Sequence, residues 1–206
     1  MEQVISIFPT PIMKIDQLLN QEMVDRVIKQ SKAADRVINT KSERLSHTHV
    51  VNPEADDNFK NICELVNPKL VEFGELLFGE KLNWKIKEMW VNILDSGGHQ
   101  ALHSHANSFI SGIIYLTKSH PSSRTVFFRN MGGSDFTFSN NNPDAFMGEF
   151  NAPKWAAPEA LPGDLVLFPS YLLHEVPKNQ GEQRMTIALN AIPDRLKIWD
   201  YEIKFI

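Results

Sequence analysis

Apolar residues in the first part of the chain recur at helical spacing, and later ones fall in short strand-like runs. Residues 17–34 and 57–77 carry apolar side chains at intervals of three and four, which is typical of amphipathic helices. Asp16 is placed to cap the first helix. The apolar run at residues 4–8 predicts a strand, and the polar stretch 39–56 predicts a loop.

After residue 80 the pattern changes to short runs rich in β-branched and aromatic residues, separated by turn residues. The predicted strands are 84–94, 109–117, 125–128, 164–169, 185–192 and 196–205. Two helices followed by a run of strands predict an α+β fold. The even spacing favours a jelly roll, that is, a cupin-like double-stranded β-helix with the N-terminal helices packed on one sheet. We therefore expect a single domain over 1–206, with a strand and two supporting helices in 1–80 and the jelly-roll core in 81–206.

The segment 131–160 is long and rich in Asn, Phe and Pro. A loop of this length inside a compact domain is often a lid or a binding loop, and the alternative is a poorly ordered insertion. Its aromatic residues either cover the mouth of a site or belong to the core. They are Phe136, Phe138, Phe146, Phe150 and Trp155.

Composition and charge narrow the classes of partner. The net charge of −4 and the absence of a Lys/Arg run predict no nucleic-acid partner. Cys63 is the only cysteine, so we expect no internal disulfide and a reducing compartment. The start lacks a signal-peptide pattern, and no window approaches the roughly 20 apolar residues that span a bilayer. We thus expect a cytoplasmic protein without a membrane segment, and the apolar tail Ile203–Ile206 is a candidate for homodimer formation.

The histidines suggest a metal site. His103 and His105 precede a predicted strand, and in an extended segment residues i and i+2 point to the same side. His174 follows another predicted strand, and three such ligands leave open positions on a metal. The His47-Thr48-His49 triplet has the same spacing but lies in the predicted polar loop, where we expect it to be exposed. The alternative is that His103 and His105 are solvated and His174 only ends a strand.

The surroundings strengthen the metal hypothesis. Gly97 before the His pair and the stretch GDLVLFPSYLLH at 163–174 are typical of the paired metal-binding segments of cupins. The usual glutamate of the first segment is absent, since Phe109 and Ile110 stand in its places. Arg184 comes ten residues after His174, and a hairpin would return it toward the histidine. An arginine grips a carboxylate through two charge-assisted hydrogen bonds.

These residues resemble the 2-oxoglutarate/Fe(II)-dependent dioxygenase superfamily. Its pattern is HxD/E, then a distal His, then Arg or Lys about ten residues later. The chain matches at His103, His174 and Arg184 and departs at His105. It is also similar to an oxygenase subfamily of marine bacteria and phages in which HxH is the rule. The shared motifs are FPTP at 8–11, WVN at 90–92, HxHxNSxxSGxxYL at 103–116 and FPS at 168–170.

The resemblance implies Fe(II) as the metal, 2-oxoglutarate and O₂ as co-substrates, and a hydroxylase, similar to prolyl hydroxylases, acting on an unidentified small molecule or protein. It implies that His103, His105 and His174 bind iron. It also implies that Arg184, helped by Thr186 or Tyr115, pairs with the distal carboxylate of 2-oxoglutarate. Asn92, Asn107 and Asn190 are candidates for orienting the proximal carboxylate or a ligand histidine. Each of these helper residues has a purely structural alternative, in a turn, a strand or the core.

Two other functions are compatible with the residues. The missing carboxylate fits a three-histidine cupin dioxygenase of the thiol-oxidising kind, which uses no 2-oxoglutarate. A metal-stabilised structural or binding jelly roll, with the histidines holding zinc or nickel, is the alternative without catalysis. Formation of succinate during turnover distinguishes the dioxygenase of the resemblance from both.

Overall fold

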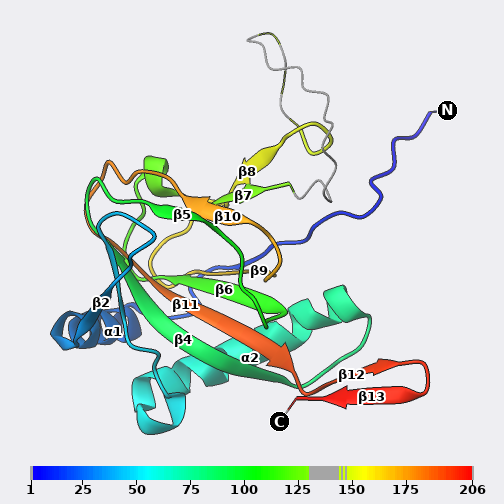
Figure 1. Ribbon diagram of the computed structural model, residues 1–206, viewed down its shortest axis with the longest axis horizontal. Coiled ribbons are helices and arrows are strands. Elements are labelled where there is room, and N and C mark those ends of the chain that lie inside the picture. Colours follow the sequence, from blue (N-terminus) through cyan, green and yellow to red (C-terminus); the bar gives the residue numbers. More distant parts are fainter. Residues whose placement is uncertain (1, 130–143, 145, 147, 206) are drawn as a thin grey trace.

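The computed structural model describes residues 2–129, 144, 146 and 148–205, in which two β-sheets face each other and two helices cover the larger sheet (Figure 1). The helices are α1 (Gln21–Ala33) and α2 (Asp57–Phe78). The larger sheet has the order β1 (Met13–Ile15), β9 (Leu165–Pro169), β6 (Ile110–Tyr115), β11 (Arg184–Pro193), β4 (Trp84–Leu94), β3 (Leu45–Thr48) and β2 (Arg36–Ile38). The smaller sheet has the order β5 (Gln100–His103), β10 (His174–Val176), β7 (Val126–Phe128) and β8 (Lys154–Ala156).

The larger sheet has two chemically different faces, because side chains alternate along its strands. The face toward the helices is apolar and forms the main core with α1 and α2. From β4, β6 and β11 it presents Met89, Val91, Ile93, Ile110, Ile114, Met185, Ile187 and Leu189. The face toward the smaller sheet carries several buried polar residues. They are Asn92, Ser111, Arg184, Thr186 and Asn190. Polar groups at buried positions of a sheet mark that interior as a site for chemistry.

The predicted helices are confirmed, with one changed start. Helix α2 begins after the N-cap Asp56 and ends at Gly79, which adopts a left-handed conformation. Helix α1 begins after Asn20, whose side chain accepts a hydrogen bond from the main-chain N–H of Met23. The predicted cap Asp16 is therefore wrong. Residues 16–17 form a turn and residues 18–19 a bend, although Leu19 is buried in the core.

Strand predictions fail where pairing decides the structure. Residues 4–8 form no strand and are exposed, whereas β1 forms further along because it pairs with β9. The predicted loop 39–56 contains β3, which pairs with β4. The predicted strand 196–205 is a hairpin of β12 (Arg195–Ile198) and β13 (Tyr201–Lys204). A strand acquires its backbone hydrogen bonds only from a partner, so composition alone does not fix it.

The ends of the predicted lid segment 131–160 are described, and its middle lies outside the described residues. Strand β8 forms within it and pairs with β7. Phe146, Phe150 and Trp155 are more than half exposed, so these three do not belong to the core. Phe136 and Phe138 lie outside the described residues.

In the tail predicted for self-association, Phe205 packs its ring against Phe109 of the same chain, and Ile203 is exposed. The homodimer stays a prediction. None of the helices in the described ranges has both the length and the apolar composition to cross a membrane.

A buried carboxylate fastens the N-terminal segment to the sheet. Asp164 is 1% exposed, and its two oxygens accept hydrogen bonds from the main-chain N–H groups of Gln17 (2.8 Å) and Leu161 (2.9 Å). The ammonium group of Lys14 lies 3.2 Å from the same carboxylate. Burial raises the pKa of Asp164, but these hydrogen bonds and Lys14 outweigh burial and hold the pKa below its ordinary 3.8.

We expect Asp164→Asn to lower the free energy of unfolding by about 1–3 kcal/mol at pH 7, because a buried charge-assisted network is broken. Since the folded-state pKa lies below the unfolded one, this stabilisation is complete above pH 3.8 and is lost as the pH falls through the folded pKa. Urea unfolding of wild type and variant between pH 7 and pH 3 measures the difference. A difference that stays constant over this range would contradict the ionised carboxylate, and the exposed Asp35→Asn is the control.

Candidate metal centre and co-substrate site

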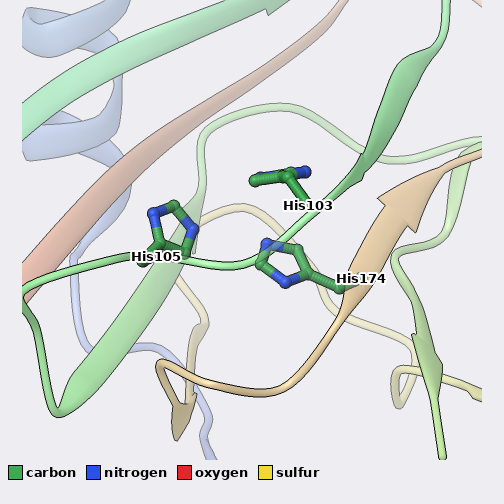
Figure 2. A group of neighbouring side chains, drawn as sticks. All are labelled: His103, His105 and His174. Atoms are coloured by element: carbon green, nitrogen blue, oxygen red, sulfur yellow. The ribbon is translucent and has the colours of Figure 1, made fainter. Parts of the chain in front are cut away.

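Three histidines meet between the two sheets (Figure 2). His103 ends β5 and His174 begins β10, and the two residues are direct partners in the antiparallel pair. His105 follows β5 in a segment tied to the end of β9 by a hydrogen bond from its N–H to the carbonyl of Ser170 (3.0 Å). One ring nitrogen from each histidine lies within 4.8 Å of those of the others. The predicted triad is therefore brought together by strand pairing.

His103 and His174 are oriented by main-chain carbonyls two residues earlier in the chain. Nδ1 of His103 lies 2.7 Å from the oxygen of Ala101, and Nδ1 of His174 lies 2.9 Å from the oxygen of Leu172. A carbonyl only accepts, so Nδ1 carries the proton in both rings and Nε2 keeps its lone pair. This is the tautomer in which histidine usually binds a metal.

Burial keeps the three imidazoles neutral. Burial and the neighbouring His103 lower the pKa of His105 to about 4 and that of His174 to about 3. Burial also lowers the pKa of His103. At neutral pH the rings therefore offer lone pairs in place of positive charges, as a metal requires. Three converging neutral imidazoles fit a divalent transition metal.

The guanidinium of Arg184 is buried without a carboxylate partner. Arg184 is 4% exposed, and its nitrogens donate to the hydroxyls of Ser119 (3.2 Å) and Thr125 (3.3 Å). It lies 5.4 Å from the centre of the Tyr115 ring. Among the described residues, no Asp or Glu oxygen lies within 4.0 Å of it. A buried cation without a counter-ion is costly, so this arrangement suits an anionic ligand.

Arg184 shares one pocket with the histidines, but not through the predicted hairpin. His174 lies on β10 of the smaller sheet and Arg184 on β11 of the larger one, so they face each other across the interior. The hairpin prediction is wrong because the connecting segment crosses between the sheets. The pocket is lined by Trp90, Asn92, Gln100, His103, His105, Gly112, Ile113, Thr125, Phe168, His174, Val176, Arg184, Thr186 and Ala188.

The predicted helper residues occupy different places. Thr186 pairs with Asn92 of β4 on one side and with Tyr115 of β6 on the other. Thr186 and Asn92 line the pocket. Asn190 is 1% exposed and lies 3.2 Å from Nδ1 of His105. Asn107 lies on an exposed turn with a φ of 55°, outside the pocket lining.

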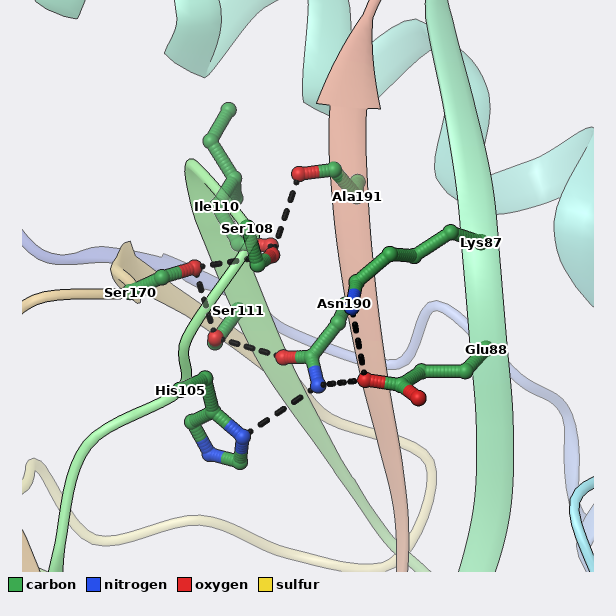
Figure 3. A network of polar contacts seen from close by, with 9 residues as sticks. All are labelled: Lys87, Glu88, His105, Ser108, Ile110, Ser111, Ser170, Asn190 and Ala191. Atoms are coloured by element: carbon green, nitrogen blue, oxygen red, sulfur yellow. Dashed lines mark hydrogen bonds and ion pairs between the residues drawn. The ribbon is translucent and has the colours of Figure 1, made fainter.

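A polar network around Asn190 was not predicted (Figure 3). Asn190 contacts Glu88 (2.7 Å) and Ser111 (2.7 Å), and Ser111 continues to Ser170 (2.8 Å). Gln100, whose amide nitrogen lies 3.4 Å from Nε2 of His103, was also missed. The signal available in the sequence was the alternation of Glu88 and Asn92 with apolar residues, which places both on the polar face of β4.

Comparison with known proteins identifies the family. Residues 88–190, half of the chain, match the family model described as a 2OG-Fe(II) oxygenase. The chain belongs to this family. The oxygenase is thus an Fe(II)- and 2-oxoglutarate-dependent oxidoreductase, which excludes the cupin without 2-oxoglutarate and the non-catalytic jelly roll. No curated protein matches the sequence significantly.

Solved structures support the fold of the oxygenase. HygX from Streptomyces hygroscopicus, with nickel and 2-oxoglutarate bound, has a TM-score of 0.66 and 13% identity, over 89% of this chain and 83% of that one. The epimerase SnoN from nogalamycin biosynthesis has a TM-score of 0.63 and 12% identity, over 90% of this chain and 80% of that one. A prolyl-4-hydroxylase from Pseudomonas putida has a TM-score of 0.60 and 13% identity, over 88% of this chain and 92% of that one. At these identities the likeness concerns the double-stranded β-helix.

Proposed function

We propose that His103, His105 and His174 hold Fe(II), and that Arg184 receives the distal carboxylate of 2-oxoglutarate. The single observation that carries this proposal is the buried guanidinium of Arg184 without a carboxylate, in the same pocket as three neutral imidazoles. Among the described residues, its side-chain hydrogen-bond partners are the hydroxyls of Ser119, Thr125 and Tyr115, and a hydroxyl does not compensate its charge as a carboxylate does. When 2-oxoglutarate is held at the metal by one end, its distal carboxylate supplies the negative charge that the guanidinium lacks.

The HxH form changes the charge of the metal site. His105 is a neutral ligand where the superfamily usually has Asp or Glu, so the loaded site carries one more positive charge. This favours the binding of the doubly negative 2-oxoglutarate. Thr186 and Tyr115 lie beside Arg184 on the same sheet face, where they would help to align the guanidinium with the bound carboxylate.

Aromatic side chains flank the histidines. The centre of the Phe168 ring lies 4.9 Å from the centre of the His174 ring, and the centre of the Phe127 ring lies 6.0 Å from it. On another side the indole of Trp90 lies 6.2 Å from the His105 ring and donates to the side chain of Asn92 (3.0 Å). A dry pocket strengthens the electrostatic contacts within it and protects a reactive oxidant from side reactions.

We propose hydroxylation of a C–H bond in a small molecule or a protein side chain as the reaction. With iron bound, O₂ oxidises 2-oxoglutarate to succinate and CO₂, and one oxygen atom goes to the substrate. The fold likeness to the prolyl-4-hydroxylase from Pseudomonas putida supports a protein substrate, and that to HygX with hygromycin B bound supports a small molecule. Trp90 and Gln100, which line the pocket beside the histidines, are placed to contact either.

The binding roles are tested by mixing the purified protein, without oxygen, with Fe(II) and 2-oxoglutarate. We expect the weak visible charge-transfer band of an iron-chelated keto acid, and succinate once oxygen is admitted. The band should persist in Arg36→Met, which removes an exposed arginine that does not line the pocket. Bound iron without a band would contradict the assigned 2-oxoglutarate site, and the absence of bound iron would contradict the triad.

A further inference from the structure

The three histidines are not equally prepared to bind a metal. His103 and His174 have Nδ1 next to a carbonyl oxygen, which fixes the proton there. His105 instead has Nδ1 next to the amide nitrogen of Asn190, at 3.2 Å. An amide nitrogen only donates, so Nδ1 of His105 is the acceptor of this contact. A neutral imidazole has one N–H, which therefore lies on Nε2, the nitrogen left to face a metal.

The contacts of Asn190 explain why its amide points this way (Figure 3). The same amide nitrogen donates to Glu88 (2.7 Å), and the amide oxygen accepts from the hydroxyl of Ser111 (2.7 Å). If the amide turned by half a rotation, its oxygen would face the carboxylate of Glu88 at that short distance. Glu88 pairs with Lys87 (3.1 Å). Burial raises the pKa of Glu88, but the hydrogen bonds from Asn190 and Lys87 lower it below its ordinary value, so the carboxylate stays ionised.

The hydroxyls behind Asn190 favour the opposite orientation. Four oxygen–oxygen contacts run from Asn190 through Ser111, Ser170 and Ser108 to the carbonyl of Ala191. Three hydroxyls supply only three protons, so one contact has none. With the amide turned, its NH₂ group donates to Ser111, and every contact in the chain receives one proton. The turned amide oxygen then accepts from Nδ1–H of His105, and Nε2 becomes free.

We infer that Asn190 is a positioning residue with two orientations, and that Glu88 holds it in the one that withholds His105 from the metal. His103 and His174 are preset ligands, whereas His105 joins them only when the amide turns. This inference rests on the proposed iron site and adds to it a control over the third ligand. The residue that replaces the usual carboxylate is then the one whose ligation depends on its neighbours.

The substitution Glu88→Gln tests the inference because its amide group can donate to the turned oxygen of Asn190. In metal-free protein labelled with ¹⁵N, long-range ¹H–¹⁵N spectra report which imidazole nitrogen carries the proton. We expect Nε2–H for His105 in the wild type and Nδ1–H in Glu88→Gln, with His103 and His174 unchanged. The His105 signals are assigned with His105→Gln. Nδ1–H in the wild type, or no change in the variant, would overturn the inference.

Ni(II) affinity gives a second readout, in which the inference predicts a change opposite to the one expected from charge alone. Removing a carboxylate near a cation site weakens metal binding by Coulomb's law. Release of His105 acts in the opposite direction, and we expect Glu88→Gln to bind Ni(II) about tenfold more tightly, the size of effects seen for groups that orient ligands. Glu72→Gln, which also loses a carboxylate paired with a lysine, is the control and should not change the affinity. Weaker binding by Glu88→Gln would overturn the inference.

A double substitution shows whether Asn190 transmits the effect. In an Asn190→Leu background, which is nearly isosteric, Glu88→Gln should leave the His105 tautomer unchanged and should not tighten Ni(II) binding, because only the loss of charge remains; thermal unfolding checks that the background is folded. Equal shifts in both backgrounds would overturn the role of Asn190. Failure of the wild type to bind Ni(II) or Fe(II) would instead reject the proposed iron site, and the spectra of the metal-free protein are read independently of it.

Discussion

Replacing His174 with alanine is expected to lower the affinity for Fe(II) by more than about 100-fold, because changes to groups that only orient a ligand already cost 10–100-fold. His174 is the direct strand partner of His103, with its Nδ1 fixed by Leu172, so it is one of the two ligands already in the metal-binding tautomer. The fold should persist, with a loss of about 1–3 kcal/mol in the free energy of unfolding, as for other buried substitutions. Metal analysis after anaerobic loading, with urea unfolding alongside, measures both.

The chain contains its own control for this substitution. His49 belongs to the other His-x-His triplet and is exposed, outside the pocket lining. His49→Ala should keep full iron occupancy and stability. Full occupancy in His174→Ala would remove that residue from the metal site, whereas a collapse of the fold would show that the histidine is needed for structure.

Replacing Arg184 with methionine is expected to produce two effects of opposite sign. The dissociation constant for 2-oxoglutarate should rise about 100-fold, since a buried charge-assisted pair typically accounts for 2–5 kcal/mol. The metal-free and co-substrate-free protein should become more stable, by about 1–3 kcal/mol, because methionine fills the volume without a buried uncompensated charge. Calorimetric titration with 2-oxoglutarate in the presence of Ni(II), and thermal unfolding without either, measure the two effects.

The opposite signs separate a binding role from a structural one. If Arg184 served only the fold, its loss would destabilise the protein, and 2-oxoglutarate binding would fall only as far as folding does. Arg184→Lys retains the charge but not the planar pair of donors, so it should recover part of the affinity. Equal 2-oxoglutarate affinity in the wild type and Arg184→Met would refute the carboxylate role.

The sequence predicted the elements whose own residues determine them. Helix α2 and strand β4 were located to within one residue, because a long periodic pattern or a long β-branched run outweighs its surroundings. Strands β5 and β10 were missed, since each has three or four residues and includes a histidine. They are strands because they pair with each other, and this long-range pairing is not written in a local pattern.

The site was predicted unevenly for a related reason. The histidines and Arg184 stand at recognisable spacings, and the fold places all four in one pocket. The partners of Asn190 are far from it in the chain, at Glu88 and Ser111, and no spacing rule connects them. Their contact depends on the register of β11 between β4 and β6, which sets Asn190 opposite both residues. Register is a property of the assembled sheet.

The alternation of the two faces of β11 constrains how such a protein can evolve. Arg184, Thr186 and Asn190 lie on the face toward the smaller sheet, where the first two line the pocket, while Ile187 and Leu189 face the helices. A point substitution alters one face and leaves the other intact, so pocket chemistry and core packing can drift separately. An inserted or deleted residue within the strand exchanges the faces, sending a guanidinium into the core and leucine into the pocket. This strand can therefore accept substitutions during evolution, whereas insertions and deletions within it disturb both the core and the pocket.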